Sequence, residues 1–154
     1  MEKQKKDLND FFVRVFNQIL SWEEQSFKTM GIEGISLREM HIIEAVCVLR
    51  DSGRNRMSEI AGYLAITPGS LTTSVNCLVK KGYLKRKNDE RDRRVVFIIP
   101  EKRAEAVNAI HKELHKKMID SITEDLCQED IVAVLKALRG VSDFFSAREK
   151  VRRG

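Results

Sequence analysis

Apolar residues recur along much of this chain at the three- and four-residue spacing of amphipathic helices. The first such segment carries four phenylalanines, and two long segments near the carboxyl end show the same periodicity. The predicted long helices cover residues 8–27, 36–50, 101–126 and 129–147. The first and the last two of these helices have wide apolar stripes, which must be buried against another surface such as a second subunit.

The middle of the chain contains signals for shorter helices. Ser36 and Glu39 have the spacing of a capping box, which begins a helix. Ser58 is placed to cap a short helix, and Thr67 followed by Pro68 is typical of the start of another. A tight connection between these two short helices predicts a helix-turn-helix.

Two short strand candidates follow, at 83–87 and 95–99, and the second, Val-Val-Phe-Ile-Ile, is strongly strand-forming. Six of the seven residues between them, 88–94, are charged, which is typical of a solvent-exposed hairpin tip. A helix-turn-helix followed by a basic hairpin is a winged helix-turn-helix. We therefore predict a mainly α (α+β) fold, in which a winged helix-turn-helix is joined to an α-helical dimerisation lobe.

Composition sets broad limits on the kind of protein. The chain has 154 residues, of which 42% are hydrophobic, and this suits one compact domain or two small lobes that share a core. No apolar run approaches the ~20 residues of a membrane-spanning helix. Because the amino-terminal residues are polar and the three cysteines are far apart, we expect a cytoplasmic protein without a disulfide framework and without a membrane partner.

The net charge is concentrated in one segment. The whole chain has 28 Lys and Arg against 23 Asp and Glu, a charge of +5. Residues 80–94 alone hold eight basic and three acidic side chains, an excess equal to that of the whole chain. This segment covers the end of the second short helix and the hairpin, so the charge favours a nucleic-acid partner.

The second short helix carries polar residues on its predicted outer face, where short side chains can reach base edges in the major groove of double-stranded DNA. Arginines at the hairpin tip are suited to phosphates or to a narrow minor groove. The alternative is an α+β domain with a solvated helix face and a charged loop. The predicted DNA-binding residues are Ser58, Thr67, Gly69, Ser70, Thr72, Thr73, Asn76, Lys80, Arg91, Asp92, Arg93 and Arg94.

With Lys81-Gly82-Tyr83 after the helix and Asp92-Arg93-Arg94 in the wing, the segment resembles the MarR family of bacterial transcription regulators. The resemblance extends over nearly the whole chain, because flanking helices are expected at both ends. It implies a homodimeric DNA-binding regulator that reads a pseudo-palindrome. It also implies that Arg94 enters the minor groove and that an ion pair with Asp92 holds it there.

The same resemblance implies two interwoven lobes. Residues 1–35 and 100–154 would form the dimerisation lobe, and residues 36–99 the winged lobe. Pro100 and Arg103 depart from the threonine and glycine that the family usually has after the wing.

A narrower resemblance concerns the effector. The segments 16–20, 23–24, 38–41 and 69–76 are similar to MarR-type repressors of fatty-acid synthesis genes, which sense long-chain acyl groups on acyl carrier protein. An acyl chain needs a dry apolar pocket, and adaptable side chains suit one. Taken singly, each candidate lining residue is more typical of an ordinary core; the candidates are Trp22, Phe27, Met30, Met40 and Ile43. Lys28, Arg38 and Lys102 are candidates for contact with the acidic carrier protein.

DNA binding by such a regulator requires no cofactor. Zinc is the alternative to the acyl group as the effector. His111 and His115 are four residues apart, a spacing that lets two imidazoles on one helix share a metal ion. Together with His41 and Glu24 they resemble the arrangement in zinc-responsive MarR regulators. Ordinary hydrogen-bonded histidines are the competing interpretation.

Other functions are less favoured. Redox sensing is a third option, but Cys47 and Cys77 lie where packing residues are expected. The sequence lacks a P-loop, a dinucleotide-binding glycine motif and a nucleophile elbow, so we do not expect an enzyme. A winged helix that binds only protein is a further alternative, although such a module does not need three arginines at its tip.

Overall fold

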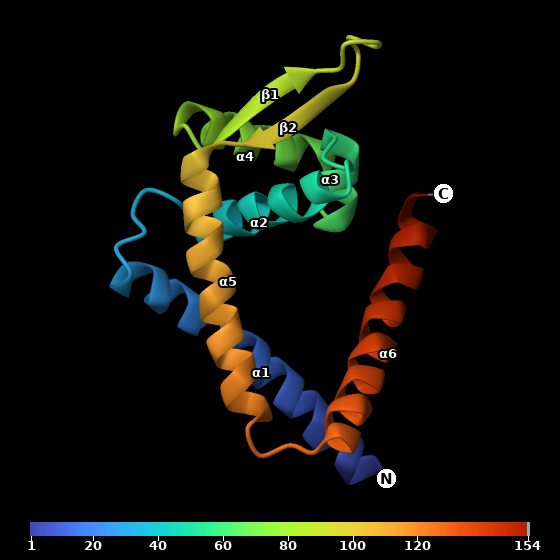
Figure 1. Ribbon diagram of the computed structural model, residues 1–154. Coiled ribbons are helices and arrows are strands. Elements are labelled where there is room, and N and C mark those ends of the chain that lie inside the picture. The colour runs from blue at the N-terminus through green and yellow to red at the C-terminus, as the bar shows by residue number, and fades with distance from the viewer. Residues whose placement is uncertain (154) are drawn as a thin grey trace.

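The computed structural model describes residues 1–153, with side chains as far as Arg148. Six helices and one two-stranded antiparallel sheet follow each other along these residues (Figure 1). The elements are α1 (Glu2–Thr29), α2 (Leu37–Asp51), α3 (Met57–Tyr63), α4 (Pro68–Lys80), β1 (Leu84–Asn88), β2 (Val96–Pro100), α5 (Lys102–Thr123) and α6 (Gln128–Arg153). The predicted class, mainly helical with a small winged sheet, is confirmed.

The first and the last helix, α1 and α6, are longer than the hydrophobic pattern predicts. α1 begins at Glu2 rather than at residue 8, and α6 continues to Arg153 rather than ending at 147. The added turns are rich in lysine, arginine and glutamate, which form helices well but leave no apolar stripe for a periodicity search to detect. Gly154, the last residue of the predicted dimerisation lobe, lies outside the described residues.

The start of α2 follows the capping box. The Ser36 hydroxyl accepts from the Glu39 backbone N–H at 3.2 Å, and the Glu39 carboxylate accepts from the Ser36 N–H at 2.8 Å. The same carboxylate accepts from Lys81 at 2.8 and 2.9 Å, which ties α2 to the end of α4. Burial alone would raise the pKa of Glu39, but the ammonium of Lys81 and the N–H of Ser36 outweigh it and lower the pKa to about 2.

The predicted cap of the first short helix is wrong. α3 begins at Met57 with Arg56 as its N-cap residue, so Ser58 lies inside the first turn. The Glu59 carboxylate instead accepts from the Arg56 backbone N–H at 3.2 Å. A glutamate in the first turn therefore satisfies one of the free N–H groups at this helix end.

The second short helix begins as predicted. The Thr67 hydroxyl accepts from the Ser70 backbone N–H at 3.2 Å, and Pro68 occupies the first turn. The connection from α3 is tight because Ala65 adopts a φ of 54°, in the left-handed region. These features fix the angle between the two helices of the helix-turn-helix.

The hydrophobic core lies under the winged sheet, and α2 runs through its middle. Met40, Ile43 and Val46 of α2 are fully buried, as are Leu71 of α4 and Ile98 of β2. β1 and β2 pair with Arg86 opposite Ile98. The inner face of α4 is thus held against the core, which leaves its polar face toward solvent.

Arg103 joins α5 to the winged elements. Its guanidinium donates to the Lys81 carbonyl at 3.2 Å and lies 4.5 Å from the centre of the Tyr83 ring. The first turn of α5 is thereby attached to the end of α4 and the start of β1.

The three helices α1, α5 and α6 expose a large apolar surface. α6 stands apart from the winged elements in Figure 1. The most exposed apolar side chains of α1, α5 and α6 include Leu8, Phe11, Phe16, Ile119, Ile122, Leu135, Leu138 and Phe145. Among the described residues, no helix is long and apolar enough to cross a membrane. The boundaries of the two lobes, at residues 35/36 and 99/100, stay a prediction.

Candidate nucleic-acid interface and histidine cluster

The outward face of α4 is polar along its whole length. Thr72, Thr73, Asn76 and Lys80 are exposed, and Ser70 is half-buried. The Thr72 and Thr73 hydroxyls donate to carbonyls one turn back, at 2.8 and 3.2 Å. Their methyl groups and the Asn76 amide are therefore presented outward by a helix whose other face is locked in the core.

Two arginines from other elements reach this face. Arg86 of β1 donates through Nη2 to Oδ1 of Asn76 at 2.5 Å. Arg38 of α2 donates to the Ser70 hydroxyl. Both contacts constrain polar groups of α4, and neither partner pair was expected from the sequence.

The hairpin tip is a structured loop with exposed arginines. The Asp89 carboxylate accepts from the backbone N–H groups of Arg91 at 2.7 Å and Asp92 at 3.0 Å. These two bonds hold the pKa of Asp89 below its ordinary value. The Asn88 amide donates to the Arg93 carbonyl at 2.9 Å, so the loop is bridged from both sides.

The expected ion pair between Asp92 and Arg94 is absent from the part of the chain that the structure describes. The Asp92 carboxylate accepts from the Arg94 backbone N–H at 3.0 Å, and the described residues include no ion pair between the two side chains. A carboxylate two residues back reaches the backbone N–H more easily than the mobile guanidinium. Asp92 therefore fixes the backbone at Arg94 and leaves the guanidinium exposed.

The structure thus divides the predicted DNA-binding residues into three groups. Thr67 to Lys80 lie along α4, and Arg91 to Arg94 lie at the hairpin tip. Ser58 is exposed on α3 and precedes both groups in the sequence.

Three histidines and one glutamate meet where α1, α2 and α5 pack together. Oε1 of Glu23 lies 2.6 Å from Nε2 of His115, 3.1 Å from Nε2 of His111 and 3.4 Å from Nε2 of His41. Glu23 is 2% exposed and His111 is fully buried. The three predicted histidines do converge.

The glutamate of this cluster is Glu23, and the predicted Glu24 is wrong. Glu24 is exposed and pairs with Lys28 at 3.6 Å. One residue turns a helix by about 100°, so adjacent glutamates face different environments. The spacing in the sequence indicates that Glu23 faces inward. It lies four residues before the buried Phe27 and three after Leu20, so all three are on the same helix face.

The electrostatics of the cluster favour a charged glutamate beside neutral His111. Burial alone would raise the pKa of Glu23, but hydrogen bonds with His111 and His115 lower it. Burial lowers the pKa of His111. Nδ1 of His111 has no hydrogen-bond partner among the described residues and lies 3.7 Å from the Glu44 carboxylate.

This donor set fits a divalent cation such as Zn²⁺. One ligand atom each from Glu23, His111 and His115 lie within 4.8 Å of one another. Neutral imidazole and carboxylate are ligands that zinc prefers. Glu44, at 3.7 Å from Nδ1 of His111, is the nearby carboxylate but lies beyond hydrogen-bond distance of that histidine.

A cavity of about 270 Å³ lies beside the cluster, between α1, α2 and the α3–α4 connection. Its walls are apolar, and His41 and Arg38 are its basic members. The lining residues are Leu20, Leu37, Arg38, His41, Ile42, Leu64 and Ile66.

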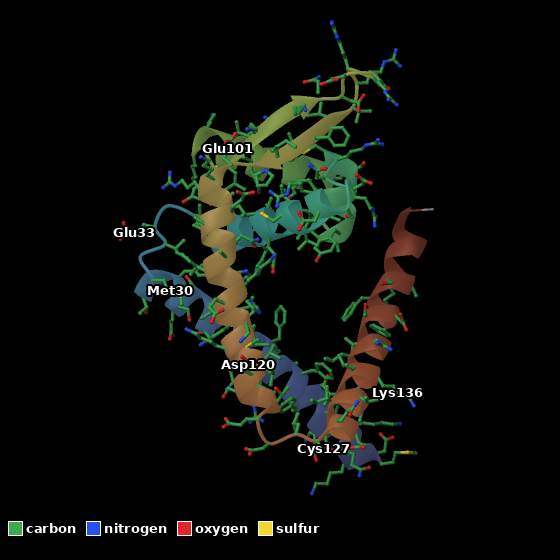
Figure 2. All side chains as sticks on the ribbon, in the orientation of Figure 1. Met30, Glu33, Glu101, Asp120, Cys127 and Lys136 are labelled. Atoms are coloured by element: carbon green, nitrogen blue, oxygen red, sulfur yellow. The ribbon has the colours of Figure 1, made fainter. Side chains whose placement is uncertain are left out.

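None of the five residues predicted to line an effector pocket lines this cavity. Phe27, Met40 and Ile43 are buried in the core, whereas Met30 is 43% exposed at the end of α1 (Figure 2). Trp22 is half-buried and packs edge-on against the His115 ring. Large apolar side chains suit a core as well as a pocket, so residue type alone cannot distinguish the two.

The cysteines are free thiols in three different settings. Cys47 is buried, and this burial raises the pKa of its thiol, which disfavours the reactive thiolate. Cys77 is half-buried on α4, and Cys127 is exposed at the turn between α5 and α6 (Figure 2). For Cys47, this favours the packing role over redox sensing.

Comparison with known proteins gives consistent matches. The model of the MarR family matches residues 36–96. A Bacillus subtilis protein described as an uncharacterized HTH-type transcriptional regulator, YcgE, is 32% identical over 87 residues. That match covers 56% of this chain and 54% of YcgE, so the chain spans about half the length of this curated relative.

Two solved structures are similar over nearly the whole chain. Streptococcus pneumoniae FabT, in complex with DNA, is 31% identical with a TM-score of 0.83, covering 93% of this chain and 98% of FabT. A MarR protein from Peptoclostridium difficile is 16% identical with a TM-score of 0.75, covering 93% of this chain and 90% of that protein. The second likeness concerns the fold alone.

Proposed function

The chain belongs to the MarR family of DNA-binding transcriptional regulators, and from this premise we propose that it is a repressor that binds a pseudo-palindromic operator as a homodimer. Proteins of this family regulate transcription and are not enzymes. The observation that carries the proposal is the near full-length likeness to FabT, which was captured on DNA. Because its target is chromosomal, we place the protein in the cytoplasm.

The exposed side chains indicate which residues would contact DNA in this proposal. α4 enters the major groove, where Ser70, Thr72, Thr73 and Asn76 face base edges. Thr67, Gly69 and Lys80 at the ends of α4, with Ser58 of α3, contact the backbone. The wing brings Arg91, Arg93 and Arg94 to the neighbouring groove, with Asp92 holding the loop.

For the effector, we propose that the protein controls fatty-acid synthesis genes in response to long-chain acyl groups on acyl carrier protein. The cavity beside α2 supports this, because apolar walls with two basic residues suit a chain that ends in a polar carbonyl. Arg38, one of three basic candidates for the acidic carrier, also donates to Ser70 of α4. An occupant that contacts Arg38 therefore acts directly on the DNA-reading helix.

Operator affinity is expected to change by roughly 5- to 150-fold when long-chain acyl carrier protein is added. The measurement is a fluorescence-anisotropy titration of operator DNA, with carrier protein lacking an acyl group as the control. In Leu20→Trp, which fills the cavity from α1, the acyl response should be lost while operator affinity without effector is kept. An unchanged affinity of the wild type with the acyl carrier would exclude this effector.

Zinc sensing is the second candidate, and the convergence of the glutamate and the histidines favours it. In this proposal Glu23, His111 and His115 hold the ion, with His41 at 3.4 Å from the glutamate as the fourth donor. Because the donors come from three helices, a bound ion would fix α1 and α5 against α2.

Glu23→Gln is expected to lower zinc affinity by more than about 100-fold, since even outer partners of metal ligands contribute 10- to 100-fold. Glu24→Gln is the matched control, because Glu24 is adjacent in sequence but points to solvent. Competition with a chromophoric chelator gives the affinity of each variant, and operator binding is followed with and without zinc. Equal zinc affinities for the two variants would contradict the site.

A further inference from the structure

Asn76 and Arg86 form a pair between the DNA-reading helix and the wing. Asn76 is on the exposed face of α4, and Arg86 is on the side of β1 that faces α4, as is the buried Leu84 two residues earlier. Arg86 Nη2 lies 2.5 Å from Asn76 Oδ1. This contact joins the two elements that are proposed to read DNA.

The chemistry of the pair defines the direction of the amide. A carboxamide has an acceptor oxygen and a donor NH₂ of similar size, and a free asparagine presents either end by turning its amide. A guanidinium has only donors, so the atom beside Arg86 must be the oxygen. The NH₂ group is consequently the end that remains available for another partner.

This direction matters for base reading. Asparagine reads adenine with both ends of its amide, because the oxygen accepts from the N6 amino group and the NH₂ donates to N7. When Arg86 engages the oxygen, the donor end dominates the readout. Base edges that offer acceptors in the major groove, such as purine N7, guanine O6 or thymine O4, then suit Asn76 better than an exocyclic amine.

We infer that Arg86 is a specificity-determining residue that acts through Asn76, by fixing its amide so that the NH₂ group faces an acceptor on one base. The inference rests on the proposed DNA-binding function. It differs from a phosphate contact by Arg86, which would strengthen binding to every sequence equally.

The test compares four variants of the full chain on a library of DNA with randomised operator positions. These are Arg86→Ala, Asn76→Ala, the double variant and Lys87→Ala. Lys87 is the matched control, because it carries the same charge on the same strand but points to the other face. Selected sequences give the base preference at each position, and anisotropy gives affinities for operator and mixed-sequence DNA.

We expect Arg86→Ala and Asn76→Ala to lose preference at the same base pair, each by about fivefold, the value of one hydrogen bond. The double variant should lose no more than either single one. Lys87→Ala should weaken binding to all sequences while its preference profile stays that of the wild type. Where the preferred base is adenine, whose acceptor in this groove is N7, a 7-deaza analogue should weaken the wild type and leave Asn76→Ala, which lacks the amide donor, unaffected.

Two results would overturn the inference while leaving the proposed function intact. One is an Arg86→Ala profile like that of Lys87→Ala. The other is a loss of preference at a base pair different from that of Asn76→Ala. If the wild type itself selects no sequence from the library, the proposed function fails, and the inference falls with it.

Discussion

Leu138→Asp is expected to convert the protein from dimers to monomers and to lower operator affinity by about 10²- to 10⁴-fold, the avidity lost when two linked sites become one. Leu138 lies in the middle of α6 and is 49% exposed, with Leu135 and Phe145 on the same stripe. A charge in a buried apolar interface is strongly destabilising, because its desolvation is not compensated.

The control for this substitution is on the same helix. Lys136→Asp introduces the same side chain about 200° away around α6, on the polar face (Figure 2). Light scattering at micromolar concentration should show dimers for the wild type and for Lys136→Asp. A wild-type monomer, or a Leu138→Asp dimer, would contradict the proposed assembly.

The dimer also sets the geometry of the operator. In the proposed homodimer, two copies of α4 related by a two-fold axis would read half-sites about one helical turn apart, ~10–10.5 bp. Inserting five base pairs between the half-sites places the second one on the opposite side of the duplex. We therefore expect this insertion to weaken wild-type binding and to leave the binding of monomeric Leu138→Asp unchanged.

The parts of the fold that could be predicted were those with strong local rules. The Ser36–Glu39 capping box and the Thr67–Pro68 helix start depend on hydrogen bonds within four residues, so the sequence pattern determines them. The second strand followed from its β-branched residues, and both strands are displaced by one residue from their predicted bounds. Ser58 failed as a cap because Glu59 offered a competing local contact with Arg56.

The site was harder to predict, because it depends on which helix faces meet. Glu23 and Glu24 differ by one position, and the phase of α1 against α5 decides which of them joins the histidines, a phase that the sequence indicates only through the spacing of Glu23 from Leu20 and Phe27. Likewise, Met40, Ile42 and Ile43 are all buried core residues, and only Ile42 of the three also lines the cavity. The contacts of Arg86 with Asn76 and of Arg38 with Ser70 are long-range, and no local pattern predicts them.

Arg94→Ala is expected to weaken operator binding by roughly 10- to 100-fold, consistent with loss of a hydrogen-bonded charged contact. Asp92 fixes the backbone at Arg94, and the exposed guanidinium is free to enter the minor groove. A narrow minor groove has an enhanced negative potential that attracts arginine. Because groove width depends on sequence, the loss should be larger on operator than on mixed-sequence DNA.

The control for this prediction removes a positive charge far from the wing. Lys116 is exposed on α5 and pairs with Asp120 at 2.8 Å, so Lys116→Ala should leave operator affinity unchanged. Binding of the wild type should fall steeply with salt, because phosphate contacts release counterions. Equal losses for Arg94→Ala and Lys116→Ala, or salt-independent binding, would mean that the concentrated charge of residues 80–94 does not act on DNA.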